Sequence, residues 1–242
     1  MEVKILYLYY DLMNLYGENG NIRVLERHLR EQGLEVTIER KSVGDDIDFS
    51  QYAFIYAGSG TERNQKIALS HLCRYKEQLK AAAESGTVLL FTGNAFEMLG
   101  KSITSGNGTV YDGAGISDFA TVEHSDTRYT GDVIATFDAL DTPLVGFINK
   151  CSEIMNVPQT LFQVVMGFGN SANDKNEGWR YKNVFGTHLI GPILVKNPHF
   201  TTYIVKLIGS SIENFEYKPL PYPYEESAYQ VTLSALQKRL EK

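Results

Sequence analysis

The stretch AFIYAGSGT, residues 53–61, joins an apolar run of strand length to a glycine-rich turn. A short, unbroken apolar run is typical of a strand buried on both faces, as in a parallel sheet. Residues 65–85 then show helical character and stop at Gly86, a residue type that commonly ends helices. A buried strand, a tight turn and a long helix together predict one unit of an α/β fold.

The same unit recurs on both sides of this stretch. The further candidates, in chain order, are a strand at 3–10, a helix at 22–33, a strand at 34–39, a strand at 87–91 and a short helix from 93 to 100. Strands and helices that alternate with short loops predict an α/β fold with an open, mostly parallel, doubly wound sheet.

The middle third of the chain has a different pattern. Strand candidates come close together there, at 109–111, 132–137, 144–148 and 164–168, with Gly, Asp and Asn between them. This spacing predicts antiparallel hairpins appended to the parallel sheet. A further strand at 184–189 and helices at 202–210 and 225–242 follow. Because we find no internal repeat, we expect one domain over residues 1–242.

Composition and charge exclude several classes of protein. The net charge of −6 over 242 residues argues against nucleic-acid binding, because such surfaces cluster Lys and Arg on phosphates. Two cysteines, Cys73 and Cys151, are too few for a disulfide framework and lack metal-ligand spacing. No stretch has the pattern of a secretory signal or the apolar length of a membrane span. We therefore expect a cytoplasmic protein without membrane insertion, metal or cofactor.

Several segments, taken together, resemble one family. They include LMNLY at 12–16, GSGTERNQ at 58–65, RYTGD at 128–132 and KNVFGTHLIGPIL at 182–194. In this order they are similar to the glutaminase subunits of lipid II isoglutaminyl synthase, a branch of the class I glutamine amidotransferases related to cobyric acid synthase. The resemblance implies a subunit that makes ammonia for an ATP-dependent, Mur-ligase-like synthetase. That partner amidates a glutamate in peptidoglycan precursors.

The groups that this family's chemistry requires are absent from their places. The family has a cysteine nucleophile at a strand-to-helix elbow, and a histidine directly before Gly-Pro that transfers the proton. By the resemblance, Gly93 stands at the nucleophile's place, Ile190 at the histidine's, and Glu97 replaces a glutamine. Glycine has no nucleophilic atom and isoleucine transfers no proton, so we predict a catalytically silent relative.

Two residues are candidate substitutes. Cys151 lies where the resemblance places a segment near the active site, but on a hairpin loop without a helix N-terminus to activate its thiol. His188 lies two residues before Ile190, on the same face of an extended chain. We interpret His188 as a polar replacement for an aromatic side chain that points to a pocket or to solvent. Cys73 is interpreted as a buried structural thiol inside the helix at 65–85.

Ligand-binding candidates lie in the loops and beside them. In the family, an arginine in the Arg-x-x-Gly-Asp setting of Arg128 is implicated in handling glutamine, and a guanidinium suits a carboxylate. The alternative for Arg128 is a surface salt bridge with Asp126 or Asp132. By the resemblance, the Gly58-Ser59-Gly60 loop would supply the N–H groups of an oxyanion hole, and Asn94 belongs to the facing turn.

Three hypotheses remain open at this point. The first is a silent subunit beside a Mur-ligase-like ATP-dependent synthetase. The second is a sensor that binds glutamine or another small amide through Arg128 and the Gly58 loop. The third is an active amidohydrolase with Cys151 as a relocated nucleophile. Loss of activity in Cys151→Ala would favour the third, and glutamine binding by the chain alone would favour the second.

Overall fold

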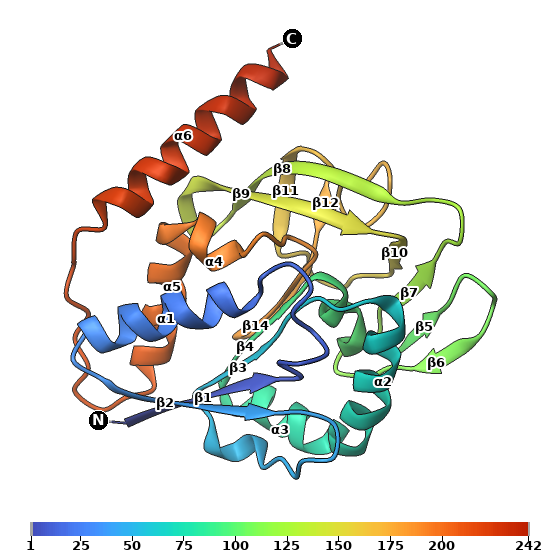
Figure 1. Cartoon of the computed structure of the whole chain (residues 1–242), viewed down its shortest axis with the longest axis horizontal. Coiled ribbons are helices and arrows are strands. Elements are labelled where there is room, and N and C mark those ends of the chain that lie inside the picture. Colours follow the sequence, from blue (N-terminus) through green and yellow to red (C-terminus); the bar gives the residue numbers. More distant parts are fainter. Residues whose placement is uncertain (1, 242) are drawn as a thin grey trace.

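A six-stranded sheet forms the centre of the computed structural model, which describes residues 2–241 (Figure 1). Its strand order is β13-β14-β4-β3-β1-β2, and every neighbouring pair is parallel apart from β13 and β14. The strands are β1 Glu2–Leu8, β2 Glu35–Lys41, β3 Phe54–Ala57, β4 Val88–Thr92, β13 Trp179–Tyr181 and β14 Val184–Thr187. The predicted open, mostly parallel sheet is confirmed.

Helices cover both faces of this sheet. One face carries α1 Asn19–Glu31, α4 Ile193–Lys196 and α5 Pro198–Ser210; the other carries α2 Glu62–Leu72, α3 Lys76–Ser85 and the short helices η1 Phe49–Gln51, η2 Cys73–Tyr75 and η3 Gly93–Leu99. Within β1, Ile5 and Tyr7 pack into the first core and Leu6 and Leu8 into the second. Side chains alternate across a strand, so a doubly covered strand requires an unbroken apolar run.

Two smaller sheets are appended to this core. The first has the order β10-β7-β5-β6 and the second the order β12-β11-β8-β9. Their strands are β5 Ser102–Thr104, β6 Val110–Asp112, β7 Ala120–Glu123, β8 Tyr129–Phe137, β9 Leu140–Lys150, β10 Ser152–Met155, β11 Phe162–Met166 and β12 Asn176–Glu177. The predicted hairpins correspond to β6, β8, β9 and β11. The parallel pair of β5 and β7 was not predicted.

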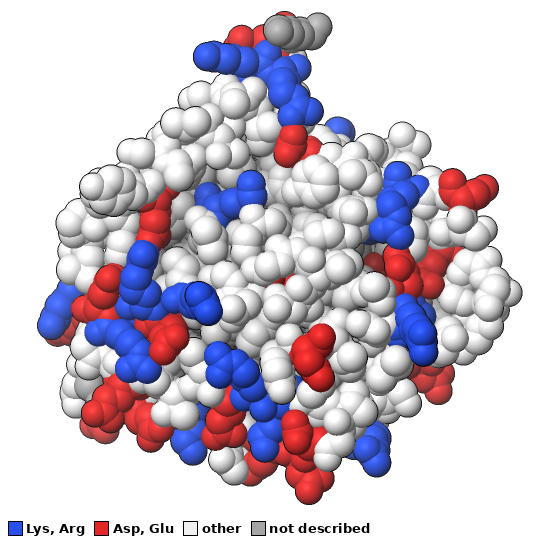
Figure 2. Space-filling view, in the orientation of Figure 1, with Lys and Arg blue, Asp and Glu red and all other residues white. Residues whose placement is uncertain are grey.

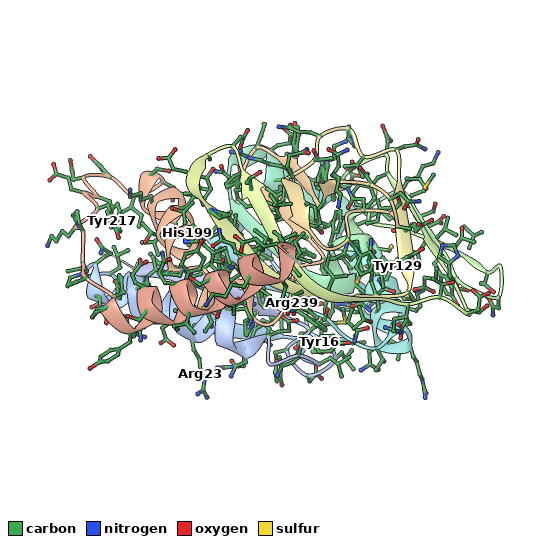
Figure 3. The ribbon with its side chains drawn as sticks, turned by 90° about the horizontal axis from the view of Figure 1, so that it is seen from above. Tyr16, Arg23, Tyr129, His199, Tyr217 and Arg239 are labelled. Atoms are coloured by element: carbon green, nitrogen blue, oxygen red, sulfur yellow. The ribbon has the colours of Figure 1, made fainter. Side chains whose placement is uncertain are left out.

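The last helix, α6 Pro223–Leu240, packs on the second appended sheet. Tyr229, Leu233 and Leu236 are buried there against side chains of β8 and β9. Arg239 lies near the end of the helix (Figure 3) and forms an ion pair with Asp132 of β8. No helix among residues 2–241 is both long enough and apolar enough to cross a bilayer.

The single long helix predicted at 65–85 is wrong. The chain forms α2, one 3₁₀ turn and α3, because the ring of Tyr75 packs on Phe49 and its hydroxyl donates to the Asp45 carbonyl. This tertiary contact overrides local helix propensity. Cys73 therefore lies half-buried at the junction, not in a helix interior. Gly86 does end α3, with a left-handed φ of +92°.

Charged side chains of both signs are interspersed on the face in Figure 2, around a broad centre without charge. Many of them lie at the lower edge of this view, where cations and anions alternate. Alternation of this kind keeps the local field weak.

Candidate functional site

A pocket of about 290 Å³ lies beyond the carboxyl ends of β3 and β4. It brings together five of the nine candidate site residues, namely Ser59, Gly60, Asn94, Arg128 and Cys151, and Glu97 borders it as well. This is the edge where ligands of open parallel sheets bind. The other four, Gly58, Gly93, His188 and Ile190, are buried and do not line the pocket.

The turn after β4 has the backbone shape of an elbow. Gly93 directly follows the strand with a left-handed φ of +59°. A Cβ on this residue would lie 2.8 Å from Ser59 Cβ, closer still to Ser59 Oγ, and 3.2 Å from a methyl carbon of Ile190. Only glycine fits here, because both the backbone angle and the space disfavour a side chain.

The two loops of the pocket are clamped together by one side chain. Asn94 donates from Nδ2 to the Gly60 carbonyl, and Asn94 Oδ1 accepts from the Gly60 N–H, both at 2.9 Å. The Gly60 amide, which the resemblance assigns to an oxyanion hole, is therefore already engaged. Asn94 fixes the loops instead of extending freely toward a ligand.

Arg128 pairs with a residue that the sequence analysis did not name. Its Nη2 lies 2.6 Å from Glu62 Oε1, and its Nη1 donates to Asn149 Oδ1 at 3.0 Å. The predicted alternatives were wrong, since Asp132 pairs with the Arg239 side chain and Asp126 bonds to Thr127. Glu62 was missed because it opens α2, 66 residues away from Arg128.

The Cys151 thiol lies in the pocket but in an unfavourable field. Burial and the nearby Glu62 carboxylate, whose Oε1 is 3.4 Å from Sγ, raise the pKa of Cys151 to about 12. A thiol in that range is almost entirely protonated at neutral pH. Since the thiolate is the nucleophile, this environment deactivates Cys151.

Comparison with known proteins gives the family. Residues 4–198 match the CobB/CobQ-like glutamine amidotransferase domain. The chain belongs to this family. It is 33% identical over 236 residues to the lipid II isoglutaminyl synthase (glutamine-hydrolyzing) subunit GatD of Staphylococcus aureus strain N315, over 98% of this chain and 94% of that protein. It is 32% identical over 219 residues to the subunit of the same name from Streptococcus pneumoniae strain R6, over 88% and 84%.

A solved structure shares the fold of this amidotransferase domain. The crystal structure of a glutamine amidotransferase matches it with a TM-score of 0.56 at 14% identity, over 84% of this chain and 98% of that one. At this identity the likeness concerns the fold alone. It confirms the class I amidotransferase architecture that the sequence predicted.

His188 lies in a buried cluster behind the pocket of the amidotransferase domain. Its Nε2 is 3.2 Å from Glu97 Oε1 and its Nδ1 is 3.5 Å from Glu177 Oε1, and all three side chains are almost fully buried. The prediction that His188 points to a pocket or to solvent is therefore wrong. The strand β14 ends at Thr187, and the next residue turns inward between two carboxylates.

The carboxylate of Glu97 is stabilised by its neighbours. Burial alone would raise the pKa of Glu97, but hydrogen bonds from His188, Ser152 and Gln65 reverse that effect and lower it. By the resemblance, Glu97 stands where the family has a glutamine. His188 lies close enough to pair with the carboxylate that this replacement introduces. Both residues are parts of one buried cluster, and Glu97 also borders the pocket.

Two further buried charges were missed by the sequence analysis. Lys150 borders the pocket and donates to the carbonyls of Gly169 and Asn170, both at 2.8 Å, and burial lowers its pKa to about 8. Glu18 accepts from Tyr56 at 2.6 Å and from Thr92 at 3.1 Å, and burial raises its pKa. Its position in a polar Gly-Glu-Asn-Gly turn gave no sign of this burial.

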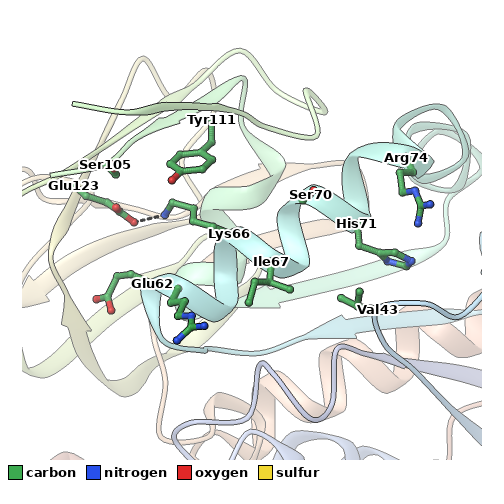
Figure 4. A pocket seen from close by; sticks show the side chains of 11 residues that line it. Val43, Glu62, Lys66, Ile67, Ser70, His71, Arg74, Ser105, Tyr111 and Glu123 are labelled. Atoms are coloured by element: carbon green, nitrogen blue, oxygen red, sulfur yellow. Dashed lines mark hydrogen bonds and ion pairs between the residues drawn. The ribbon is translucent and has the colours of Figure 1, made fainter. Parts of the chain in front are cut away.

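A larger open groove of about 1,100 Å³ runs along the outer side of α2 (Figure 4). Arg63 and Arg74 lie on it, and Lys66 crosses it to form an ion pair with Glu123 of β7. Glu62 and Glu123 line both hollows, so the groove adjoins the pocket. Of the predicted site residues, none lines the groove.

Proposed function

We propose that this chain is a catalytically silent, glutamine amidotransferase-like subunit of a lipid II isoglutaminyl synthase-type complex. Gly93 is the observation that carries the proposal. A glycine with a left-handed φ follows β4, in a space already filled by Ser59 and Ile190. Without a thiol at this elbow there is no covalent route, and the nearest side chains, Ser59 and Ile190, provide no base. Both relatives are named as subunits of lipid II isoglutaminyl synthase, and this supports the type of complex that we propose.

The proposed partner is a Mur-ligase-like, ATP-dependent synthetase that amidates a glutamate in a peptidoglycan precursor. The two relatives are named as subunits of an enzyme, which supports a partner for this chain. We further propose that residues 1–242 act as one domain and that the complex is cytoplasmic. The silent subunit would stabilise the synthetase or control its supply of ammonia.

A glutaminase assay on the purified chain tests the silence directly. We expect release of glutamate from glutamine to stay at the buffer rate, with and without the co-expressed synthetase. Gly93→Cys alone is expected to stay inactive, because Ile190 still transfers no proton. Ordinary turnover that disappears in Cys151→Ala would instead establish the relocated nucleophile.

Partnership is tested separately by co-expression with a Mur-ligase-like synthetase and gel filtration at micromolar concentration. A specific interface of about 1,200–2,000 Å² survives such dilution. We expect the Ser59 and Gly93 variants that fold to co-purify as the wild type does. Clean separation of the two proteins would reject the subunit role.

A second candidate function is reversible binding of a small amino acid or amide. The pocket remains open and polar, and Arg128 and Glu62 provide charges of both signs within it. Such a pair suits a zwitterion, whose carboxylate and ammonium can replace each ion's partner. Titration calorimetry with glutamine tests this role, which is compatible with a silent subunit.

A further inference from the structure

The outer side of α6 carries the two most exposed large apolar side chains of residues 2–241. They are Tyr224, which is 90% exposed, and Val231, which is 72% exposed. Seven residues separate them, which is close to two helical turns, so both lie on one side of the helix. Ala228 and Ala235 are exposed as well and belong to the same side, at alternate spacings of four and three residues. We call these four residues the outer row.

A second apolar row attaches α6 to the rest of the protein. Tyr229, Leu233 and Leu236 have the same alternate spacing and are buried against side chains of β8 and β9. The last turns of the helix extend past the rest of the chain (Figure 1). Because the inner row fixes the helix, the outer row is left facing solvent. Apolar rows with spacings of four and three residues are the pattern by which helices pair in coiled coils.

Charge is confined to the two ends of α6. Glu225 and Glu226 lie in the first turn and Lys238 and Arg239 in the last, and the eleven residues between them, 227–237, carry no charge. This part of the surface is white at the upper left of Figure 2, with basic side chains at its far end. The helix dipole explains the sign of the charge at each end. It does not explain an uncharged middle, because polar and charged residues normally cover the solvent side of a surface helix.

The charges at the ends select one arrangement of two such helices. In an antiparallel pair the acidic end of each helix lies beside the basic end of the other, whereas a parallel pair would bring like charges together at both ends. Lys238 follows Ala235 by three residues and so continues the line of the outer row toward the acidic end of a partner. One surface then serves both copies, as in a twofold homodimer.

We propose that α6 pairs antiparallel with α6 of a second copy of this chain, outer row against outer row. A contact of two helices is smaller than a standard interface of about 1,200–2,000 Å², so the dimer forms only at high protein concentration. The helix lies outside residues 4–198, which match the amidotransferase domain, and none of its residues lines the pocket. The inference therefore goes beyond the proposed subunit role and uses a different surface.

Sedimentation velocity of the full chain, from low micromolar to several hundred micromolar, tests the dimer. We expect a monomer at the low end and a rising fraction of dimer at the high end. Val231→Glu should abolish the dimer, because it places two like charges in the middle of the contact. Gln230→Glu is the matched control: it adds the same charge at an exposed neighbour outside the outer row, and should leave the dimer intact.

Cross-linking tests the orientation of the two helices. Tyr224→Cys and Lys238→Cys are prepared as separate chains, one of them tagged, in a background of Cys73→Ser and Cys151→Ser. After mixing and mild oxidation, an antiparallel pair gives the disulfide between the two different variants. Disulfides only within each variant would indicate a parallel pair and overturn the proposal.

The remaining outcomes also decide. A chain that stays monomeric over the whole concentration range overturns the proposal, as does a dimer that survives in Val231→Glu. If the chain is monomeric and Val231→Glu no longer co-purifies with the synthetase, the outer row is a contact of that partner instead. Because both cross-linking positions are exposed on the helix, that result does not depend on the folding of Val231→Glu.

Discussion

Gly93 and Ser59 share one small volume at the elbow. Gly93→Cys would place its Cβ 2.8 Å from Ser59 Cβ and nearer to Oγ, with a φ of +59° that disfavours side chains. Overpacking costs about 1–3 kcal/mol, and the left-handed backbone adds about 1 kcal/mol. We therefore expect Gly93→Cys to lower the free energy of unfolding by about 2–4 kcal/mol, measured by chemical denaturation.

A graded series of second substitutions isolates the cause. In the Gly93→Cys background, Ser59→Ala removes the hydroxyl and leaves Cβ, whereas Ser59→Gly removes both. We expect partial recovery of stability with Ser59→Ala and more with Ser59→Gly, apart from the backbone contribution. If neither substitution recovers stability, the Ser59 side chain is not the obstacle.

Cys151 provides a prediction about reactivity. Burial and then Glu62 raise the pKa of its thiol to about 12, so little thiolate exists at pH 8. Glu62→Gln removes the nearer anion, lowers this pKa and should accelerate alkylation by iodoacetamide several-fold, followed by mass spectrometry. Asp126→Asn, which removes an equal charge that does not act on the thiol, should leave the rate unchanged. Equal rates in all three proteins would show that burial alone controls Cys151.

At the scale of elements, His188 joins the end of β14 to η3 through Glu97 and to β12 through Glu177. His188→Phe would leave two buried carboxylates without their shared partner. Removing one member of a buried ionic group costs about 3–5 kcal/mol. In the same background, Glu97→Gln should recover part of that loss, as shown by a double-mutant cycle in urea. Strictly additive losses would mean that the two side chains do not interact.

The two sides of α6 make a matched comparison. Leu233 is buried against β8 and β9, whereas Val231 is 72% exposed. We expect Leu233→Ala to lower the free energy of unfolding by about 2–3 kcal/mol, and Val231→Ala to change it by less than about 0.5 kcal/mol. Denaturant unfolding distinguishes them. Similar losses for both would place α6 in a different rotation about its axis.

Prediction from the sequence was strongest for elements and weakest for contacts between them. The apolar runs at β1, β3 and β4 have a pattern that few other environments produce, so the parallel sheet was predictable. The break at Tyr75 depends on a partner in a distant loop, and no proline or glycine marks it. The partners of three residues are distant in the sequence and meet them only in the folded chain, namely those of Glu62, Glu18 and Lys150. The local sequence pattern therefore could not predict these contacts.

For the whole molecule, the free energy of unfolding should decrease in two steps as the pH is lowered. Burial lowers the pKa of His199 to about 4 from an ordinary 6.5, so the unfolded chain binds more protons and stability is lost as pH falls between these values. Glu97, whose pKa lies below the ordinary 4.5, contributes stability that is lost only at lower pH. The pKa of buried His28 is lowered to about 4 as well, so His199→Phe should reduce the first step without abolishing it and leave the second, as measured by thermal unfolding across pH. An unchanged first step would show that His199 does not contribute to it.

The shared volume at the elbow also has a historical consequence. A side chain introduced at residue 93 alone would clash with the Ser59 side chain, whereas Ser59→Gly alone would only leave a small cavity. We expect that neither step alone gives a working nucleophile and that each intermediate is less stable than the present pair. If the subunit is silent as proposed, no gradual series of substitutions leads to a thiol at the elbow, so related sequences are expected to differ in what the pocket binds sooner than to gain hydrolysis.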